Sequence, residues 1–167
     1  MLSLQHLRAF GRSDRGSALV EFSVSAIFLF LVMFGLMEIA RALYVANFIS
    51  NAAPEAIRYA IVRGSTWNAA PCNSITTSQC TATAANVSSY LDSLAPIGVL
   101  TSSDYLTVAT TWPGTTPSGA SCSPQGVKNA PGCVVQVNVK YSFGFILPLM
   151  PNQNLALTST SAMAISQ

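Results

Sequence analysis

The chain has 167 residues, a length that suits one compact domain plus an anchoring segment. Half of the residues are hydrophobic and 8% are charged, whereas ordinary soluble domains carry about 25% charged residues. The formal net charge of +2 lies in the first 16 residues, because the five acidic and five basic side chains after them cancel. This composition excludes a typical cytosolic domain, and the sequence has no basic stripe with interleaved aromatic side chains that would bind nucleic acid.

The first 37 residues have the pattern of a basic leader followed by a membrane-spanning helix. Residues 1–16 contain three arginines, and residues 17–37 are apolar apart from Glu21. About 20 apolar residues suffice for a helix to cross a bilayer, and the positive-inside rule places a basic flank in the cytoplasm. We therefore expect a single-pass protein whose leader is cytoplasmic and whose residues after the span lie outside the cytoplasm.

A secretory signal peptide is the alternative interpretation of the same segment. Ala40, Arg41 and Ala42 fit the small-x-small cleavage pattern, and cleavage there would leave a chain that begins at Leu43. The apolar core of a signal peptide is about 7–15 residues long, which is shorter than this run, and the run contains a carboxylate. These two differences favour the membrane anchor.

A narrow polar stripe marks one side of the predicted span. Ser17, Glu21 and Ser25 recur every four residues, so they share one face of a helix. Small and polar residues on an otherwise apolar helix are typical of a helix–helix contact. The alternative is that Glu21 lies at the membrane edge, where a carboxylate can reach the headgroups at a low free-energy cost.

Four cysteines follow the apolar segment and indicate an oxidising compartment. An even number of cysteines in loop-rich sequence favours disulfides, and position along the chain suggests the pairs Cys72–Cys80 and Cys122–Cys133. Four cysteines allow three different pairings. The alternative interpretation is that all four cysteines are free thiols in a cytosolic domain. A zinc site is disfavoured, because the spacings do not match paired C-x-x-C ligands.

The sequence contains no set of residues that predicts catalysis or a cofactor. His6 is the only histidine and lies in the leader, so a Ser-His-Asp or Cys-His site has no base elsewhere in the chain. Asp92 and Asp104 are isolated, and no P-loop or metal-ligand cluster occurs. We expect no enzymatic activity, cofactor, metal or small-molecule substrate.

The remaining pattern predicts an α+β fold. Residues 38–64 continue the helix, with Ile39, Leu43, Ala46 and Ser50 on one side, a possible kink at Pro54 and a C-cap at Gly64. Residues 65–167 form the extracytoplasmic domain: a loop over 65–83, a helix over 84–95, and strands over 105–112, 133–143 and 155–165. A long N-terminal helix should pack on an antiparallel sheet of three or four strands, with loops stapled by disulfides.

Two loops of this domain have distinct compositions. Residues 113–132 are rich in proline, glycine and serine and contain Cys122. Residues 145–151, FILPLMP, are apolar. The apolar loop either folds onto the domain's own core or forms an exposed patch that contacts another subunit or the membrane.

Several short motifs resemble one family. Residues 15–22, RGSALVEF, resemble a type IV prepilin processing site, with Gly16, Glu21 and Phe22 at the matching positions. Within that class, residues 12–64 resemble the TadE-like family of minor pseudopilins from tight-adherence (Flp), type IVb-like pilus systems. Residues 52–60, AAPEAIRYA, resemble the family's A-A-R-E-G-A-R-Y-A stretch, from which Pro54 and Ala56 depart.

The resemblance implies a function and a location. A prepilin peptidase would cut between Gly16 and Ser17, leaving Glu21 as the fifth residue of the mature chain, and Glu21 and Phe22 would serve assembly. The expected partners are the bacterial inner membrane, the peptidase, other pilins and pilus assembly proteins. Because the domain is larger than the major subunits of such systems, the resemblance favours a minor pilin involved in surface attachment. The alternative is a signal-anchored or secreted binding or adhesin domain that never joins a filament.

Overall fold

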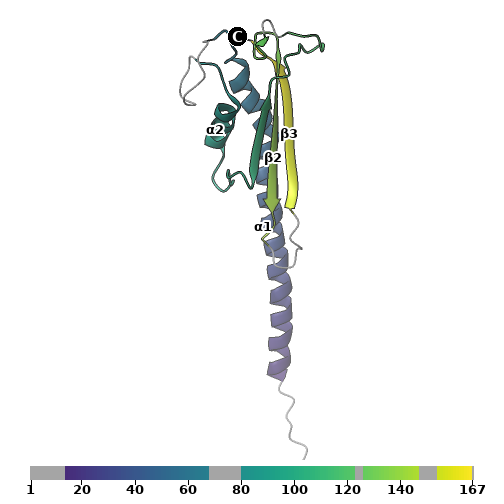
Figure 1. Cartoon of the computed structure of the whole chain (residues 1–167). Coiled ribbons are helices and arrows are strands. Elements are labelled where there is room, and N and C mark those ends of the chain that lie inside the picture. Colours follow the sequence, from purple (N-terminus) through teal and green to yellow (C-terminus); the bar gives the residue numbers. More distant parts are fainter. Residues whose placement is uncertain (1–13, 68–79, 123–125, 147–153, 167) are drawn as a thin grey trace, which may run out of the picture. The chain divides into compact units, whose positions relative to one another are not determined.

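The computed structural model describes residues 14–67, 80–122, 126–146 and 154–166 (Figure 1). The chain divides into two compact units, Met1–Ala40 and Arg41–Gln167. The elements are, in chain order, helices α1 (Asp14–Ile61) and α2 (Ala84–Leu94) and strands β1 (Leu106–Thr111), β2 (Val134–Gly144) and β3 (Asn154–Ala164).

The three strands form one antiparallel sheet in the order β1-β2-β3, with β2 in the centre. Alternate residues of β2 point into the core, and none of these five side chains is more than 5% exposed: Val135, Val137, Val139, Tyr141 and Phe143. This is the alternation that a sheet with one buried face requires. The predicted α+β class, with a long apolar helix and a small antiparallel sheet, is confirmed, and the sheet has three strands in the described part of the chain.

The second half of α1 supplies the helical side of the core. Its buried residues recur at helical spacing and include Val45, Ile49, Ala53 and Ile57, each at most 2% exposed. The buried stripe differs from the apolar side predicted from sequence, since Leu43 is 65% exposed.

Pro54 lies inside α1, and the helix continues past it to Ile61. Proline has no N–H, so the carbonyl of the residue four positions earlier loses its helical donor. That residue is Ser50, and the hydroxyl of Ser159 on β3 donates to its carbonyl oxygen at 3.2 Å. A side chain of the sheet therefore replaces the hydrogen bond that the proline removes.

The helix ends three residues before the predicted C-cap at Gly64. The carbonyl of Ile61 accepts hydrogen bonds at 3.0 Å from both the backbone N–H and the hydroxyl of Ser166, just after β3. The N–H of Ser65 donates instead to the carbonyl of Asn129 at 2.9 Å. Backbone groups that would have extended the helix thus find partners in other parts of the domain.

Helix α2 agrees with its prediction. Thr83 and Asn86 form a capping box, in which the Thr83 hydroxyl accepts from the Asn86 N–H at 3.2 Å and the Asn86 side chain accepts from the Thr83 N–H at 3.0 Å. The helix ends at Leu94, shortly before Pro96. The rings of Tyr90 on α2 and Tyr59 on α1 stack with centroids 4.5 Å apart, which ties the two helices together.

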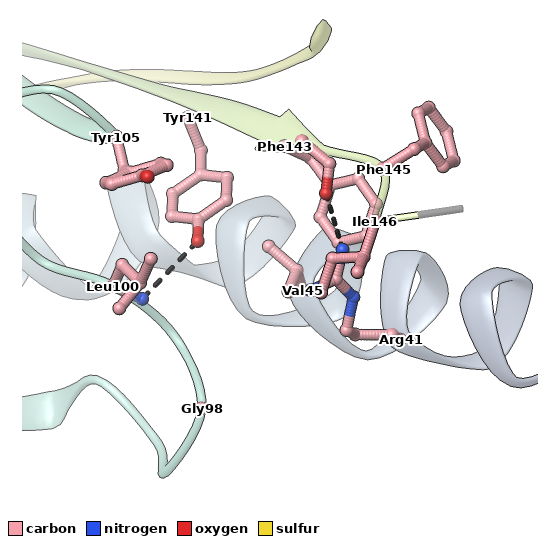
Figure 2. A pocket seen from close by; sticks show the side chains of 10 residues that line it. Arg41, Val45, Gly98, Leu100, Tyr105, Tyr141, Phe143, Phe145 and Ile146 are labelled. Carbon is pink, nitrogen blue, oxygen red and sulfur yellow. Dashed lines mark hydrogen bonds between the residues drawn. The ribbon is translucent and has the colours of Figure 1, made fainter. Parts of the chain in front are cut away.

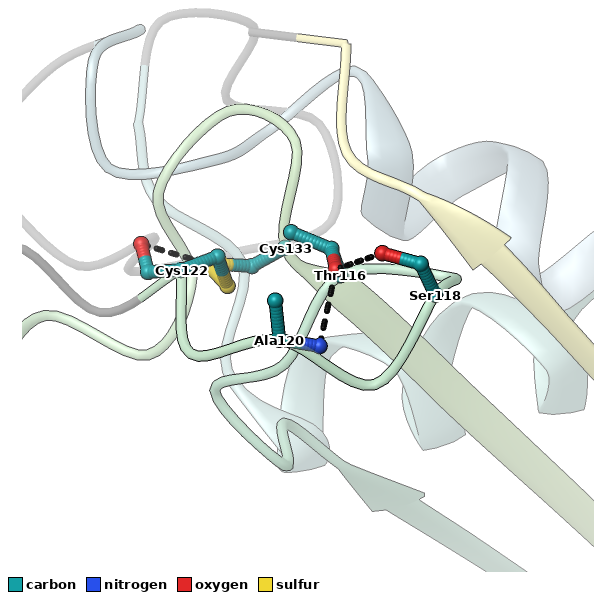
Figure 3. The surroundings of a disulfide bond; sticks show 5 residues. All are labelled: Thr116, Ser118, Ala120, Cys122 and Cys133. Carbon is teal, nitrogen blue, oxygen red and sulfur yellow. Dashed lines mark hydrogen bonds between the residues drawn. A yellow bond between two sulfur atoms is a disulfide. The ribbon is translucent and has the colours of Figure 1, made fainter.

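A disulfide joins the loop after β1 to the start of β2. Cys122 and Cys133 are bonded across a sequence separation of 11, as position along the chain predicts (Figure 3). Closing a loop of this length stabilises a fold by about 3 kcal/mol in the chain-entropy model. Cys80 is also disulfide-bonded, but Cys72 lies outside the described residues, so the Cys72–Cys80 pairing stays a prediction. Most of the apolar loop 145–151 lies outside them as well.

Candidate processing and assembly segment

The residues predicted for processing and assembly lie together in the first turns of α1. Helix α1 begins at Asp14, so Gly16, Ser17, Glu21 and Phe22 occupy consecutive turns of one helix. All four are exposed, and the ring of Phe22 is 72% exposed. The segment is therefore open to a peptidase or to a neighbouring helix.

The polar stripe of this segment has the spacing that the sequence predicts. Ser17, Glu21 and Ser25 lie four residues apart within α1, and all three are exposed. Another serine of the segment, Ser23, is satisfied inside the helix, because its hydroxyl donates to the carbonyl of Leu19 at 2.7 Å. The Ser23 hydroxyl therefore needs no hydrogen-bond partner outside the helix in an apolar environment.

The surface around the stripe is apolar and uncovered. Within the described residues, one helical stretch, Gly16–Ile61, is long and apolar enough to cross a membrane; its most apolar window has a mean hydropathy of 2.3 and no buried residue. Large apolar side chains are exposed along it, including Phe28 at 70% and Leu29 at 66%. An uncovered apolar surface of this length is unfavourable in water and indicates a membrane or a partner helix.

A second candidate site is a hollow in the domain of residues 41–167, with a volume of about 280 Å³ (Figure 2). The guanidinium of Arg41 lies over the ring of Phe143, 4.5 Å from its centroid, and donates to the carbonyl oxygen of Gly144. Across the hollow, the N–H of Leu100 donates to the hydroxyl of Tyr141 at 3.3 Å. The sequence gives no signal for this hollow, because its residues come from four separate stretches of the chain.

The described residues contain no group of three or more potential metal ligands. The hollow is lined by one cation among apolar and aromatic side chains. Glu55 and Arg58 form an ion pair at 3.3 Å on the surface of α1. An exposed pair of this kind contributes little to stability.

Comparison with known proteins bears on the first of these two sites. Residues 16–58 match the family described as TadE-like protein. The match confirms the resemblance predicted from sequence and begins at Gly16, the residue before the predicted cleavage point. No curated protein and no solved structure matches the chain.

The TadE-like segment associates the chain with Tad pili, and the apolar N-terminal helix indicates a membrane anchor. This family is not known for enzymatic activity, which agrees with the sequence prediction. The matched region ends in α1, three residues before the end of the helix. The sheet, α2 and the disulfide therefore lie outside the part of the chain that the family describes.

Proposed function

We propose that the chain is a minor pilin-like subunit of a tight-adherence (Flp) pilus that is cut between Gly16 and Ser17 by a prepilin peptidase. After cleavage it is held in the inner membrane by α1 and enters the filament, where its domain contributes to surface attachment. The observation that carries this proposal is the exposed start of α1, in which a glycine precedes a polar stripe and an uncovered apolar surface within the matched segment 16–58.

The position of Gly16 supports cleavage. The Gly16–Ser17 bond lies in the first turn of α1, which begins at Asp14. The first four N–H groups of a helix have no partner within it, so unwinding this turn to present an extended bond breaks few hydrogen bonds. Glycine has no side chain and adopts extended or turned backbone conformations readily, which allows a peptidase to approach closely.

The position of Glu21 supports assembly. Cleavage creates an ammonium group at Ser17, one helical turn before Glu21 on the same face. In a bundle of such helices, the ammonium of one subunit pairs with the Glu21 carboxylate of a neighbour. A pair of opposite charges in an apolar bundle fixes the register of the helices more than it adds stability.

Replacement of Glu21 tests this role. Glu21→Gln keeps the size and the hydrogen-bonding capacity but removes the charge, and Glu21→Ala removes the whole group. Both variants should insert at least as well as the native chain, because a carboxylate within a membrane costs a few kcal/mol. We expect normal membrane abundance and intact disulfides, with loss of pilus yield and of co-purification with other pilins.

Ser25→Ala is the matched control, because it changes the same face without changing the charge. It should assemble like the native chain. Native-like assembly of both Glu21 variants would instead show that Glu21 is a membrane-edge residue. If the native chain itself never co-purifies with pilins although it is cleaved and anchored, the alternative of an anchored binding domain is supported.

A further inference from the structure

Strand β3 is an open edge of the sheet. Among the described residues, β2 is the one strand that pairs with it (Figure 1), whereas the other edge strand, β1, is shorter and contacts α2. β3 pairs with β2 from Asn154 to Ala164 without a bulge, and no charged residue follows Lys140 in the sequence. Natural edge strands usually carry a charge, a proline or a bulge that prevents pairing with another chain, and β3 contains none of these.

The backbone of β3 turns alternate residues toward this open edge. Just after the strand, the N–H of Ile165 donates to the carbonyl of Cys133 at 2.8 Å, and the carbonyl of Ile165 accepts from the N–H of Gly132 at 2.9 Å. Because the direction alternates along an antiparallel strand, the odd-numbered residues of β3 bond β2 and the even-numbered ones point their N–H and carbonyl groups away from it. All six even-numbered residues are exposed: Asn154, Ala156, Thr158, Thr160, Ala162 and Ala164.

The sequence of β3 is nearly symmetric about its central residue, Ser159. If two β3 strands pair antiparallel about this residue, most positions meet a residue of similar character: Thr158 opposite Thr160, Ala156 opposite Ala162 and Leu155 opposite Met163, each of them twice. The exceptions are Leu157 opposite Ser161 and Asn154 opposite Ala164. Matched pairs across neighbouring strands stabilise a sheet, whereas like charges opposite each other destabilise it. The uncharged strand is therefore complementary to a second copy of itself.

The exposed apolar side chains of β3 fit the same arrangement. Leu155 and Met163 are 42% and 44% exposed. They lie opposite the buried residues Phe143 and Val135 of β2, so they belong to the face of the sheet that packs on the core. In the symmetric pair, Leu155 of each copy lies beside Met163 of the other. Both side chains then lose contact with water, which favours association.

We propose that β3 pairs antiparallel with β3 of a second copy of this chain, so that the two sheets become one continuous sheet. The same surface of both copies meets in such a pair, which is the arrangement of a two-fold interface. The even-numbered residues of the two strands exchange backbone hydrogen bonds, and Ser159 of each copy lies at the two-fold axis. This interface goes beyond the proposed function, because it concerns residues 41–167 and rests neither on cleavage nor on filament assembly.

The pair also determines how the two domains are oriented. Within the domain, α1 runs alongside β3 in the same direction, because Ser50 and then Ile61 accept hydrogen bonds from Ser159 and then Ser166. An antiparallel pair of β3 strands therefore holds the two domains in opposite directions. The partner is a copy whose domain faces the other way, and not a neighbour in the same orientation.

Cross-linking of two cysteine variants tests the register. Thr158→Cys and Thr160→Cys place thiols on the exposed face of β3, and position 158 of one copy lies opposite position 160 of the other. Opposite residues that exchange hydrogen bonds have Cα atoms about 5.5 Å apart, which a disulfide can bridge, whereas identical positions lie diagonally, about 7–8 Å apart. With the full chain in excess detergent under mild oxidation, we expect an equal mixture of the two variants to give several-fold more covalent dimer than either variant alone.

A proline in the edge tests the backbone pairing. Thr160→Pro removes an N–H that points to the open edge, where proline is tolerated, and Thr160→Ala is the matched control. Both variants lose the hydroxyl that accepts from the Asn138 side chain at 2.6 Å, but the proline alone removes the N–H. By analytical ultracentrifugation we expect the native chain and Thr160→Ala to dimerise alike, and Thr160→Pro to dimerise several-fold more weakly.

The native Tm and an intact Cys122–Cys133 disulfide establish that each variant is folded, and if the proline variant is not, the cross-linking register decides. Equal cross-linking of the mixture and of the single variants would overturn the inference, as would a native chain that stays monomeric at every concentration. A dimer that the folded proline variant does not weaken would be formed by another surface and would contradict the inference too. None of these results bears on the proposed function, which is tested by variants at Glu21.

Discussion

Asp92 is an acidic residue whose protonation is coupled to folding. It lies in the last turns of α2, and desolvation by burial raises the pKa of its carboxyl above the ordinary value of 3.8. The negative end of the helix dipole also disfavours an anion there. Because the pKa is higher in the folded state, the stability linked to this group is fully present below about pH 3.8 and is lost as the pH rises through the folded value.

Asp92→Asn should therefore raise the Tm of the chain in detergent at pH 7 and leave it unchanged at pH 3. A gain of a few tenths of a kcal/mol, up to about 1 kcal/mol, is expected for removing an anion from a helix C-terminus. Asp104→Asn, at an exposed position outside any helix, controls for the loss of a charge. A change in Tm of equal size at both pH values would contradict the linkage.

At the scale of elements, Pro54 and Ser159 form a compensating pair. Pro54 has no N–H to donate to the carbonyl oxygen of Ser50, and the Ser159 hydroxyl donates to that oxygen instead, at 3.2 Å. Ser159→Ala should cost about 0.5–1.5 kcal/mol of unfolding free energy, the usual net value of a hydrogen bond. In a Pro54→Ala background the new N–H of residue 54 bonds Ser50, so the same serine substitution should cost much less.

A double-mutant cycle by chemical denaturation measures this coupling. Ser161→Ala, two residues further along β3 on the same face and similarly half-buried, is the matched control. Its cost should be independent of the residue at position 54. Equal costs of Ser159→Ala in both backgrounds would contradict the compensation.

The elements that the sequence predicts well are those with strong local signals. The alternation of β2 from Val135 to Phe143 requires one buried face, and the α2 pattern ends at a proline, so each element follows from a short window. The end of α1 could not be predicted in this way, because Ile61 finds its hydrogen-bond donor at Ser166, 105 residues later. The hydrogen bond from Ser159 that compensates for Pro54 could not be predicted either, because the two residues are far apart in the sequence.

At the scale of the whole molecule, the proposed processing and assembly segment is recognisable as a sequence motif, whereas the domain's surfaces are not. Gly16, Glu21 and Phe22 all lie within residues 16–22, so one short motif contains the whole candidate segment. The hollow beside Arg41 is assembled from α1, the turn after α2 and the end of β2. Its residues become neighbours through folding, and no spacing along the chain encodes them.

The proposed function assigns different roles to the anchor and to the domain. The matched segment 16–58 contains the anchor and most of α1, and we propose that it provides what pilus subunits share. The sheet and the disulfide-closed loop at Cys122–Cys133 lie outside that segment. On this account, the surface that is recognised lies in residues 65–167, and the segment that is assembled lies before them.

Variants at Gly16 give the control for the central claim, which is cleavage of the leader. Gly16→Leu places a bulky side chain at the residue that precedes the bond, while α1 and the domain are unchanged. This variant should remain in the membrane with its leader attached, and intact-mass measurement detects the 16 additional residues.

N-terminal sequencing of the native chain, extracted from the membranes of cells that assemble Tad pili, tests the account most directly. The account predicts a mature protein that begins at Ser17 with the sequence SALVEF. A chain that begins at Leu43, the residue after Ala40-Arg41-Ala42, would identify a cleaved secretory signal and contradict both the anchor and the pilin-like function.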